Sequence, residues 1–197
     1  MRHPVSLVLC LGGAVFLSAC QNNSDAQVQR ALKDVNVIDE SNLNDVMLSV
    51  ADPNEAVDYF TKTLAANPGR IDLMRGLARS LTRAQKATES AQIWRQVITH
   101  PEATPEDRVM LADALIRSNQ WPEAKAELNQ IPPTHETFDR YRLEAMVADS
   151  DKNWKKADSF YETAVGLTTT PASTLNNWGF SKLTRGDAPG AEKLFIE

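Results

Sequence analysis

A small residue followed four positions later by a bulky one recurs in this chain about every 34 residues. The small residues are Ala56, Ser90, Ala124, Ala157 and Ala191, and the bulky ones are Phe60, Trp94, Leu128, Tyr161 and Phe195. Two antiparallel helices that pack closely need a small residue where their backbones approach and a bulky residue beside it. Because one such pair cannot bury its own apolar face, the repeat constrains the chain to stack successive helix pairs.

A second pattern marks the first helix of each unit. A large residue is followed at once by a small one at Leu77-Ala78, Leu111-Ala112 and Trp178-Gly179, and more weakly at Leu43-Asn44 and Glu144-Ala145. Together the two patterns resemble the tetratricopeptide repeat (TPR) over residues 37–197. The resemblance implies an all-α, superhelical solenoid of antiparallel helix pairs, with about five units and an incomplete last one. Leu194, Phe195 and Ile196 would leave an uncapped apolar edge, so we expect the natural chain to continue.

Local signals predict several helix ends. Asp52, Thr104, Thr134 and Asp187 are predicted N-caps, and the first two precede a proline that suits the first helical position. Pro132-Pro133 must end the helix that begins near Trp121, which makes the third unit the short one.

The N-terminal 19 residues have the features of an export signal. Met1-Arg2-His3 precedes an apolar run that is too short for a permanent membrane span, and Leu17-Ser18-Ala19-Cys20 follows. This ending resembles the lipobox of bacterial lipoproteins, which implies that Cys20 is lipidated and becomes the N-terminus of the mature chain. An ordinary secretory signal and an N-terminal membrane anchor are the alternatives.

Residues 20–36 are polar, and we expect them to form a flexible tether between the lipid and the repeats. Gln21, rather than an aspartate, follows Cys20. The resemblance to lipoproteins therefore favours the outer membrane, on its periplasmic side, over the inner membrane. The formal net charge of −5 argues against nucleic acid as a partner.

The sequence lacks the spacings that catalysis or metal binding requires. Its three histidines are dispersed, no nucleophile motif or phosphate-binding glycine loop occurs, and Asp149–Asp151 fits a solvated turn better than a catalytic pair. We therefore expect no catalytic residues, no metal, no cofactor and no enzyme activity. Trp94, Tyr161, Phe195 and Trp178 are interpreted as core residues. Trp121 and Trp154 begin second helices, where TPRs often carry an aromatic, and receive no ligand role.

TPR proteins usually bind peptides on the face that the first helices of the units line. In the present register, this candidate peptide-binding groove comprises Arg75, Arg79, Arg83, Val109, Asp113, Ile116, Arg142, Met146, Asn176, Phe180 and Leu183. The three arginines are spaced by four residues and form one stripe, which suits the acidic end of a peptide. The alternative is a solvated face in which Arg79 pairs with Asp113 or Asp72.

The segment Leu175–Leu183, followed by Arg185-Gly186-Asp187, resembles the TadD-type lipoproteins of Flp (Tad) pilus assembly. The resemblance implies a pilotin-like scaffold that helps an outer-membrane secretin, or another pilus-assembly component, to localise or assemble. Two alternatives remain: a TPR lipoprotein adaptor for peptidoglycan enzymes or outer-membrane protein assembly, and a hydrolase or ligand-binding lipoprotein whose active domain follows Glu197.

Overall fold

The computed structural model describes residues 42–196, and every regular element in this range is an α-helix. The chain divides at Asp45 into two units. Of the first unit only residues 42–45 are described, and they are helical. The predicted signal, Cys20 and the tether lie outside the described residues, so the predicted domain boundaries stay predictions. No helix in the described range is long and apolar enough to cross a bilayer.

The second unit begins at Val46 and contains all the labelled helices. Residues 46–49 are helical and precede α2. The labelled helices are α2 (Pro53–Ala66), α3 (Ile71–Arg83), α4 (Ala87–Val97), α5 (Pro105–Arg117), α6 (Trp121–Leu128), α7 (Phe138–Ser150), α8 (Trp154–Gly166), α9 (Ala172–Thr184) and α10 (Ala188–Ile196).

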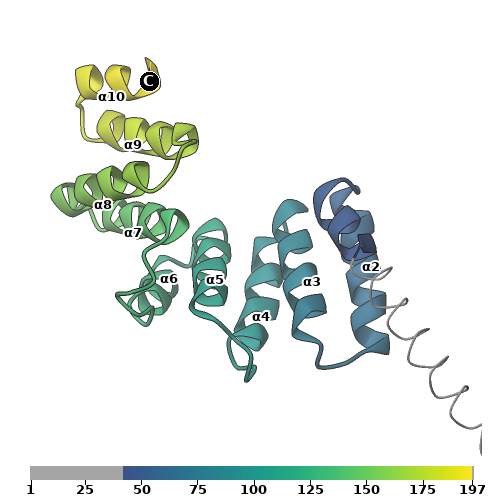
Figure 1. The fold of residues 1–197 in the computed structure, drawn as a ribbon. Coiled ribbons are helices and arrows are strands. Elements are labelled where there is room, and N and C mark those ends of the chain that lie inside the picture. Colours follow the sequence, from purple (N-terminus) through teal and green to yellow (C-terminus); the bar gives the residue numbers. More distant parts are fainter. Residues whose placement is uncertain (1–41, 197) are drawn as a thin grey trace, which may run out of the picture. The chain divides into compact units, whose positions relative to one another are not determined.

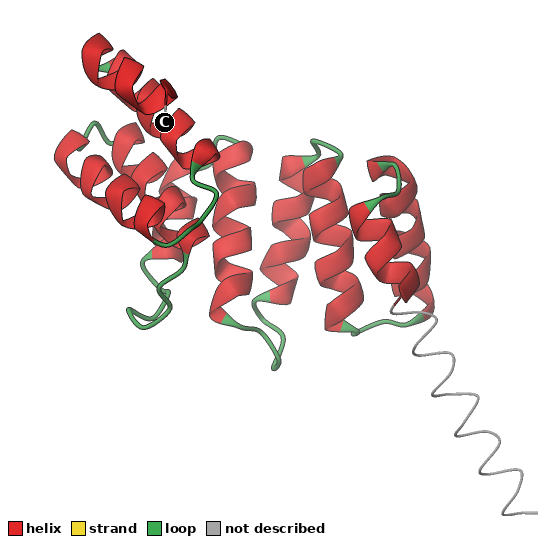
Figure 2. Cartoon of the chain, turned by 45° about the horizontal axis from the view of Figure 1, so that its top comes forward, coloured by secondary structure: helices red, strands yellow, loops and turns green. Residues whose placement is uncertain are grey.

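Consecutive helices of this unit lie side by side and run in opposite directions, joined by short loops (Figures 1 and 2). Four pairs are complete in the described range: α3 with α4, α5 with α6, α7 with α8, and α9 with α10. The first helices of successive pairs also contact one another, α5 with α7 and α7 with α9. This nearest-neighbour packing confirms the predicted all-α TPR solenoid.

The small-and-bulky repeat packs as predicted in the first four of its five units. All five small residues are buried, and Phe60, Trp94 and Tyr161 are at most 1% exposed. A methyl group added at Gly76 would lie 2.3 Å from the Phe60 ring, and one added at Gly179 would lie 2.4 Å from the Phe195 ring. Each glycine therefore lets a bulky side chain of the neighbouring helix reach the helix backbone.

The predicted caps are confirmed at three of four positions. Asp52 accepts hydrogen bonds from two backbone amides of α2, Thr104 and Asp107 form a capping box, and Asp187 accepts from the Gly190 amide at 3.0 Å. The prediction for Thr134 is wrong, because Thr137 is the N-cap of α7. Residues 129–137, including the two prolines, form the loop between α6 and α7. This loop is longer than expected, because α7 begins after Thr137 and not after Thr134.

The turn inside each complete pair has one repeated geometry. Gln85, Asn119, Lys152 and Gly186 all have a positive φ between 57° and 84°. The amide after each of them donates to the carbonyl five residues earlier, for example Lys86 to Leu81 at 2.9 Å. This is the 6→1 hydrogen bond of a Schellman motif. Gln85 and Lys152 adopt this conformation without glycine, because the packed helices on both sides impose it.

Candidate functional site

The face lined by α3, α5, α7 and α9 carries two hollows. The first, which we call the arginine hollow, has a volume of about 310 Å³ and is lined by Leu48, Arg79, Thr82, Arg83, Trp94, Met110 and Asp113. The second, the tryptophan hollow, has a volume of about 320 Å³ and is lined by Trp121, Met146, Asp149, Ser150, Trp154, Tyr161, Asn177, Phe180, Ser181 and Thr184. Both are open to solvent, and together they include five of the predicted groove residues.

The three arginines of the predicted stripe have different roles. Arg75 is bound to Asp107, with Nε to Oδ1 at 2.8 Å and Nη2 to Oδ2 at 2.7 Å, and it also donates to the carbonyl of Glu102. Arg83 donates to the carbonyls of Met47 and Ala51 at 2.9 and 2.8 Å. Both guanidinium groups therefore hold neighbouring segments together, which limits their availability to a partner.

Arg79 is the member of the stripe that remains available. Its side chain is exposed and lines the arginine hollow. Neither of the two acids that the solvated-face alternative assigned to Arg79 forms an ion pair with it. Asp72 pairs with Arg70, and Asp113 pairs with other arginines. Within residues 42–196 Arg79 forms no ion pair. A cation of this kind at the edge of a hollow can meet an acidic group of a partner without breaking an internal contact.

Asp107 shows why the neighbouring pair is structural. Its side chain is 4% exposed, and Oδ2 also accepts the backbone amide of Thr104 at 2.8 Å. Burial alone would raise the pKa of this carboxyl, but the bonds from Arg75 and Thr104 outweigh burial and lower the pKa. The carboxylate thus joins α3 to the first turn of α5.

A chain of polar contacts connects the two hollows. Arg142 donates to Asp139 at 3.0 Å and to Asp113 at 3.5 Å, and Asp113 also pairs with Arg117. The same guanidinium contacts the Met146 sulfur at 3.8 Å. Asp113 lines the arginine hollow and Met146 lines the tryptophan hollow, so the two belong to one continuous surface.

The tryptophan hollow is mostly apolar and contains one charged lining residue, Asp149. The indoles of Trp121 and Trp154 come from the first positions of α6 and α8, and Phe180, which is 58% exposed, comes from α9. The Trp121 indole is fixed by a 2.7 Å hydrogen bond from Nε1 to Asn119. An exposed phenylalanine beside two tryptophans is typical of a binding surface rather than of a solvated face.

Asp149 is held in a defined orientation. The Tyr161 hydroxyl donates to Oδ2 at 2.8 Å, and the Ser181 hydroxyl donates to Oδ1 at 2.7 Å. Burial raises the pKa of the Asp149 carboxyl despite these two bonds and the nearby Arg185. Burial next to this carboxylate also raises the pKa of Tyr161. The prediction of a solvated turn at Asp149 is wrong, because α9 packs against this end of α7 and covers it in part.

Four other predicted groove residues lie elsewhere. Val109 and Ile116 are 0% and 6% exposed, and they belong to the core because α5 is covered on more sides than a surface helix. Their assignment to the groove is wrong. Asn176 and Leu183 are exposed on α9 but line neither hollow. The core assignment of Phe195 is also wrong, since Phe195 is 44% exposed.

Sequence reasoning missed Trp121, Trp154 and Asp149. Both tryptophans follow a turn with a positive φ, and the shared turn geometry directs them toward the hollow side. Trp178, predicted as core, is partly buried: it stacks on Tyr161 with ring centroids 6.0 Å apart, and its indole donates to Asp158. The recurrence of tryptophan at the first position of α6 and α8 was the available signal.

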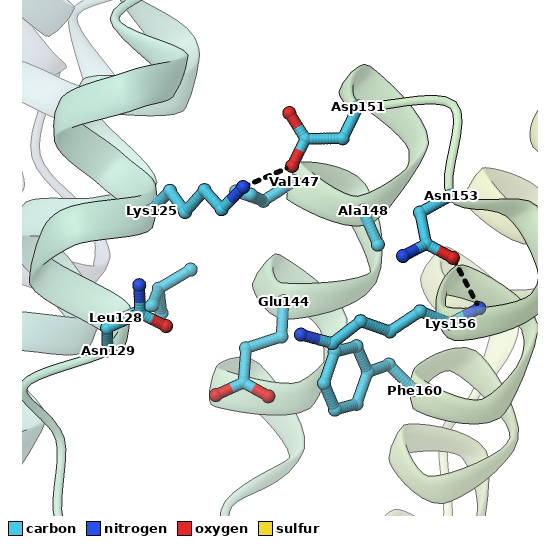
Figure 3. Close-up of a pocket in the computed structure, with 10 residues that line it drawn as sticks. All are labelled: Lys125, Leu128, Asn129, Glu144, Val147, Ala148, Asp151, Asn153, Lys156 and Phe160. Carbon is cyan, nitrogen blue, oxygen red and sulfur yellow. Dashed lines mark hydrogen bonds and ion pairs between the residues drawn. The ribbon is translucent and has the colours of Figure 1, made fainter.

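A smaller pocket of about 120 Å³ lies between α6, α7 and α8 (Figure 3). It is polar: Lys125 bonds to Asp151 at 2.6 Å across it, and the Lys156 ammonium lies 5.2 Å from the centre of the Phe160 ring. Lys125 and Asp151 pair with each other, and Glu144 pairs with Arg140, so this pocket offers less to a ligand than either hollow. Within the described residues, no three His, Cys, Asp or Glu side chains gather as a metal site would require.

No protein-family model matches this sequence, and no curated protein sequence matches it. Solved structures do share its fold. MamA (residues 41 to the end) from Desulfovibrio magneticus RS-1 superposes with a TM-score of 0.64 at 16% identity, over 79% of this chain and 89% of that one. YrrB, described as a TPR protein with an unusual peptide-binding site, superposes with a TM-score of 0.58 at 14% identity, over 78% and 79%.

A third similar structure is the APC/C hetero-tetramer Cut9–Hcn1, with a TM-score of 0.65 at 12% identity, over 78% of this chain and 30% of that one. At these identities the likeness concerns the fold alone. The described part of the chain thus has the TPR fold, a superhelical stack of antiparallel helix pairs.

Proposed function

We propose that this protein is a membrane-anchored TPR scaffold that assists assembly of a Flp-type pilus, as a pilotin-like factor for the outer-membrane secretin. The surface with the two hollows binds the partner, and lipid on Cys20 keeps the solenoid at the outer membrane. The chain acts by binding, without a chemical step of its own. Restricting a binding surface to the membrane where the secretin inserts raises its effective concentration there.

The observation that carries the proposal is that the segment resembling TadD-type lipoproteins, Leu175–Leu183, contributes side chains to the lining of the tryptophan hollow. In this segment Trp178 and Gly179 serve packing, because they contact Tyr161 and Phe195. Asn177 and Phe180, from the same segment, line the tryptophan hollow. The resemblance therefore includes residues that line the proposed binding surface as well as residues of the helix packing, which supports a shared binding role in addition to a shared fold.

Deletion of the gene is expected to lower the amount of secretin multimer in outer-membrane fractions and to abolish surface pili. Complementation with a Cys20→Ser form should give an uncleaved precursor that incorporates no radiolabelled palmitate, and it should fail to restore secretin localisation. The wild-type gene is the matched control. Normal multimers and pili in the deletion strain would contradict the proposal and favour an adaptor for peptidoglycan enzymes or outer-membrane protein assembly.

Arg79→Glu is expected to weaken capture of the partner several-fold while the helical content stays unchanged, because Arg79 is exposed and forms no internal ion pair within residues 42–196. Added salt should weaken the wild-type complex in the same direction, since exposed charges are screened. Lys62→Glu, which changes the net charge equally at an exposed site on α2, serves as the control. Equal capture by the two variants would place Arg79 on a solvated face without a role in binding.

A further inference from the structure

The tryptophan hollow combines aromatic walls with a half-buried negative charge. Trp121, Trp154 and Phe180 provide the walls, Met146 contributes a flexible apolar side chain, and Asp149 is the one charged residue among the lining side chains. The volume of about 320 Å³ is larger than that of a few water molecules and suits a long side chain. Such a site discriminates by charge as well as by apolar contact.

The charge of Asp149 is oriented but not neutralised. Each carboxylate oxygen accepts one hydroxyl bond, from Tyr161 or Ser181, and an ionised carboxylate has about four acceptor positions. Two positions therefore remain for a ligand. Within residues 42–196 Asp149 forms no ion pair, whereas Asp107 and Asp113 are both bound to arginines.

The cations near the hollow are bound to other acids. Arg185 pairs with Asp158 and lies 5.9 Å from the centre of the Trp154 ring, outside the lining of the hollow. Arg142 pairs with Asp139 and Asp113. Moving either guanidinium to Asp149 would break an existing ion pair, so the remaining acceptor positions of Asp149 are best met by a cation from another molecule.

We propose that the tryptophan hollow binds an arginine or lysine side chain from an otherwise apolar segment of the partner protein. The aliphatic part of such a side chain would pack against Trp121, Trp154 and Met146, with its cationic group near the indole faces and bonded to Asp149. The inference rests on the proposed role as a protein-binding scaffold and specifies what this surface recognises. Arg79 at the arginine hollow then meets an acidic residue outside this apolar segment, elsewhere along the same partner chain, which gives the bound chain a direction.

The test begins with phage-displayed random dodecapeptides selected on the full chain. Enriched peptides are synthesised, and those that lose affinity with Phe180→Ala but not with Leu183→Ala are kept as ligands of the tryptophan hollow. Both positions are exposed on α9, at 58% and 45%, and only Phe180 lines the hollow. We expect these peptides to carry arginine or lysine flanked by apolar residues.

The charge is then tested on both sides of the contact. Replacing the peptide's arginine with citrulline, or its lysine with norleucine, should weaken binding about tenfold. The same replacement should have little effect on binding to Asp149→Asn, because the interaction between the two sites is then absent. Asp151→Asn, which removes a more exposed carboxylate just beyond the same helix, should retain the tenfold difference.

Three results would overturn the inference. Hollow-directed peptides that tolerate citrulline or norleucine in the wild type would show that no cation is required, even if Asp149→Asn does not fold. Peptides that bind but ignore Phe180→Ala would place recognition elsewhere and leave the scaffold function intact. If no peptide is enriched at all, the proposed scaffold function fails together with the inference.

Discussion

Replacing Asp107 with alanine is expected to lower the free energy of unfolding by about 3 kcal/mol. The variant removes both oxygens that bind Arg75 and also the side-chain half of the Thr104 capping box. It leaves the Arg75 guanidinium, 26% exposed, without its carboxylate at the contact between α3 and α5. Denaturant unfolding followed by circular dichroism should show a lower midpoint with an unchanged slope.

Asp72→Ala is the matched control, because Asp72 is also an acid in the first turn of a helix and pairs with an arginine. Its pair is exposed, so the expected loss is below about 1 kcal/mol.

The effect of Asp107→Ala on the free energy of unfolding should also depend on pH. Its pKa is lowered in the folded chain, so its contribution is complete above the unfolded pKa of about 4 and is lost as the pH falls through the lower folded value. If the difference in free energy of unfolding between the wild type and Asp107→Ala stays constant down to low pH, the stabilising role of the Asp107 carboxylate is contradicted.

Replacing Ala124 with leucine is expected to destabilise the third repeat unit, formed by α5 and α6, by about 1–3 kcal/mol. Ala124 is fully buried where α6 packs against α5. Because α6 is only eight residues long, it has few other contacts that could compensate for a displacement. The additional methyl groups have no space in a packed interface, so the helices must separate. The melting temperature should fall by several degrees.

Ala126→Leu provides the control for this prediction. Ala126 lies on the same short helix, two residues further along and exposed, so leucine there should change stability by less than about 0.5 kcal/mol. If the two variants have the same melting temperature, Ala124 is not the position at which α5 and α6 approach most closely.

The candidate site was predictable in outline, because helical spacing places Arg79, Met146 and Phe180 on the surface of first helices. Burial was the main source of error. Val109 and Ile116 occupy positions equivalent to groove residues, yet the packing of neighbouring helices encloses them. Whether a residue faces a hollow or a covered surface depends on the neighbouring unit, which helical periodicity does not describe.

The sequence by itself determined the repeat, the helix pairing and most of the caps, because these depend on contacts between residues close together in the chain. Ala56 with Phe60, Ser90 with Trp94 and Asp52 at the start of α2 all follow from local spacing. Tertiary structure alone decided which charges remain for a partner. Arg75 is already bound to Asp107, which lies 32 residues away in the sequence and beside it in the fold. Asp149 and Trp154 come together at the tryptophan hollow because α7, α8 and α9 pack there. Such long-range contacts are set by how successive pairs stack, and a single period of the sequence carries no information about that.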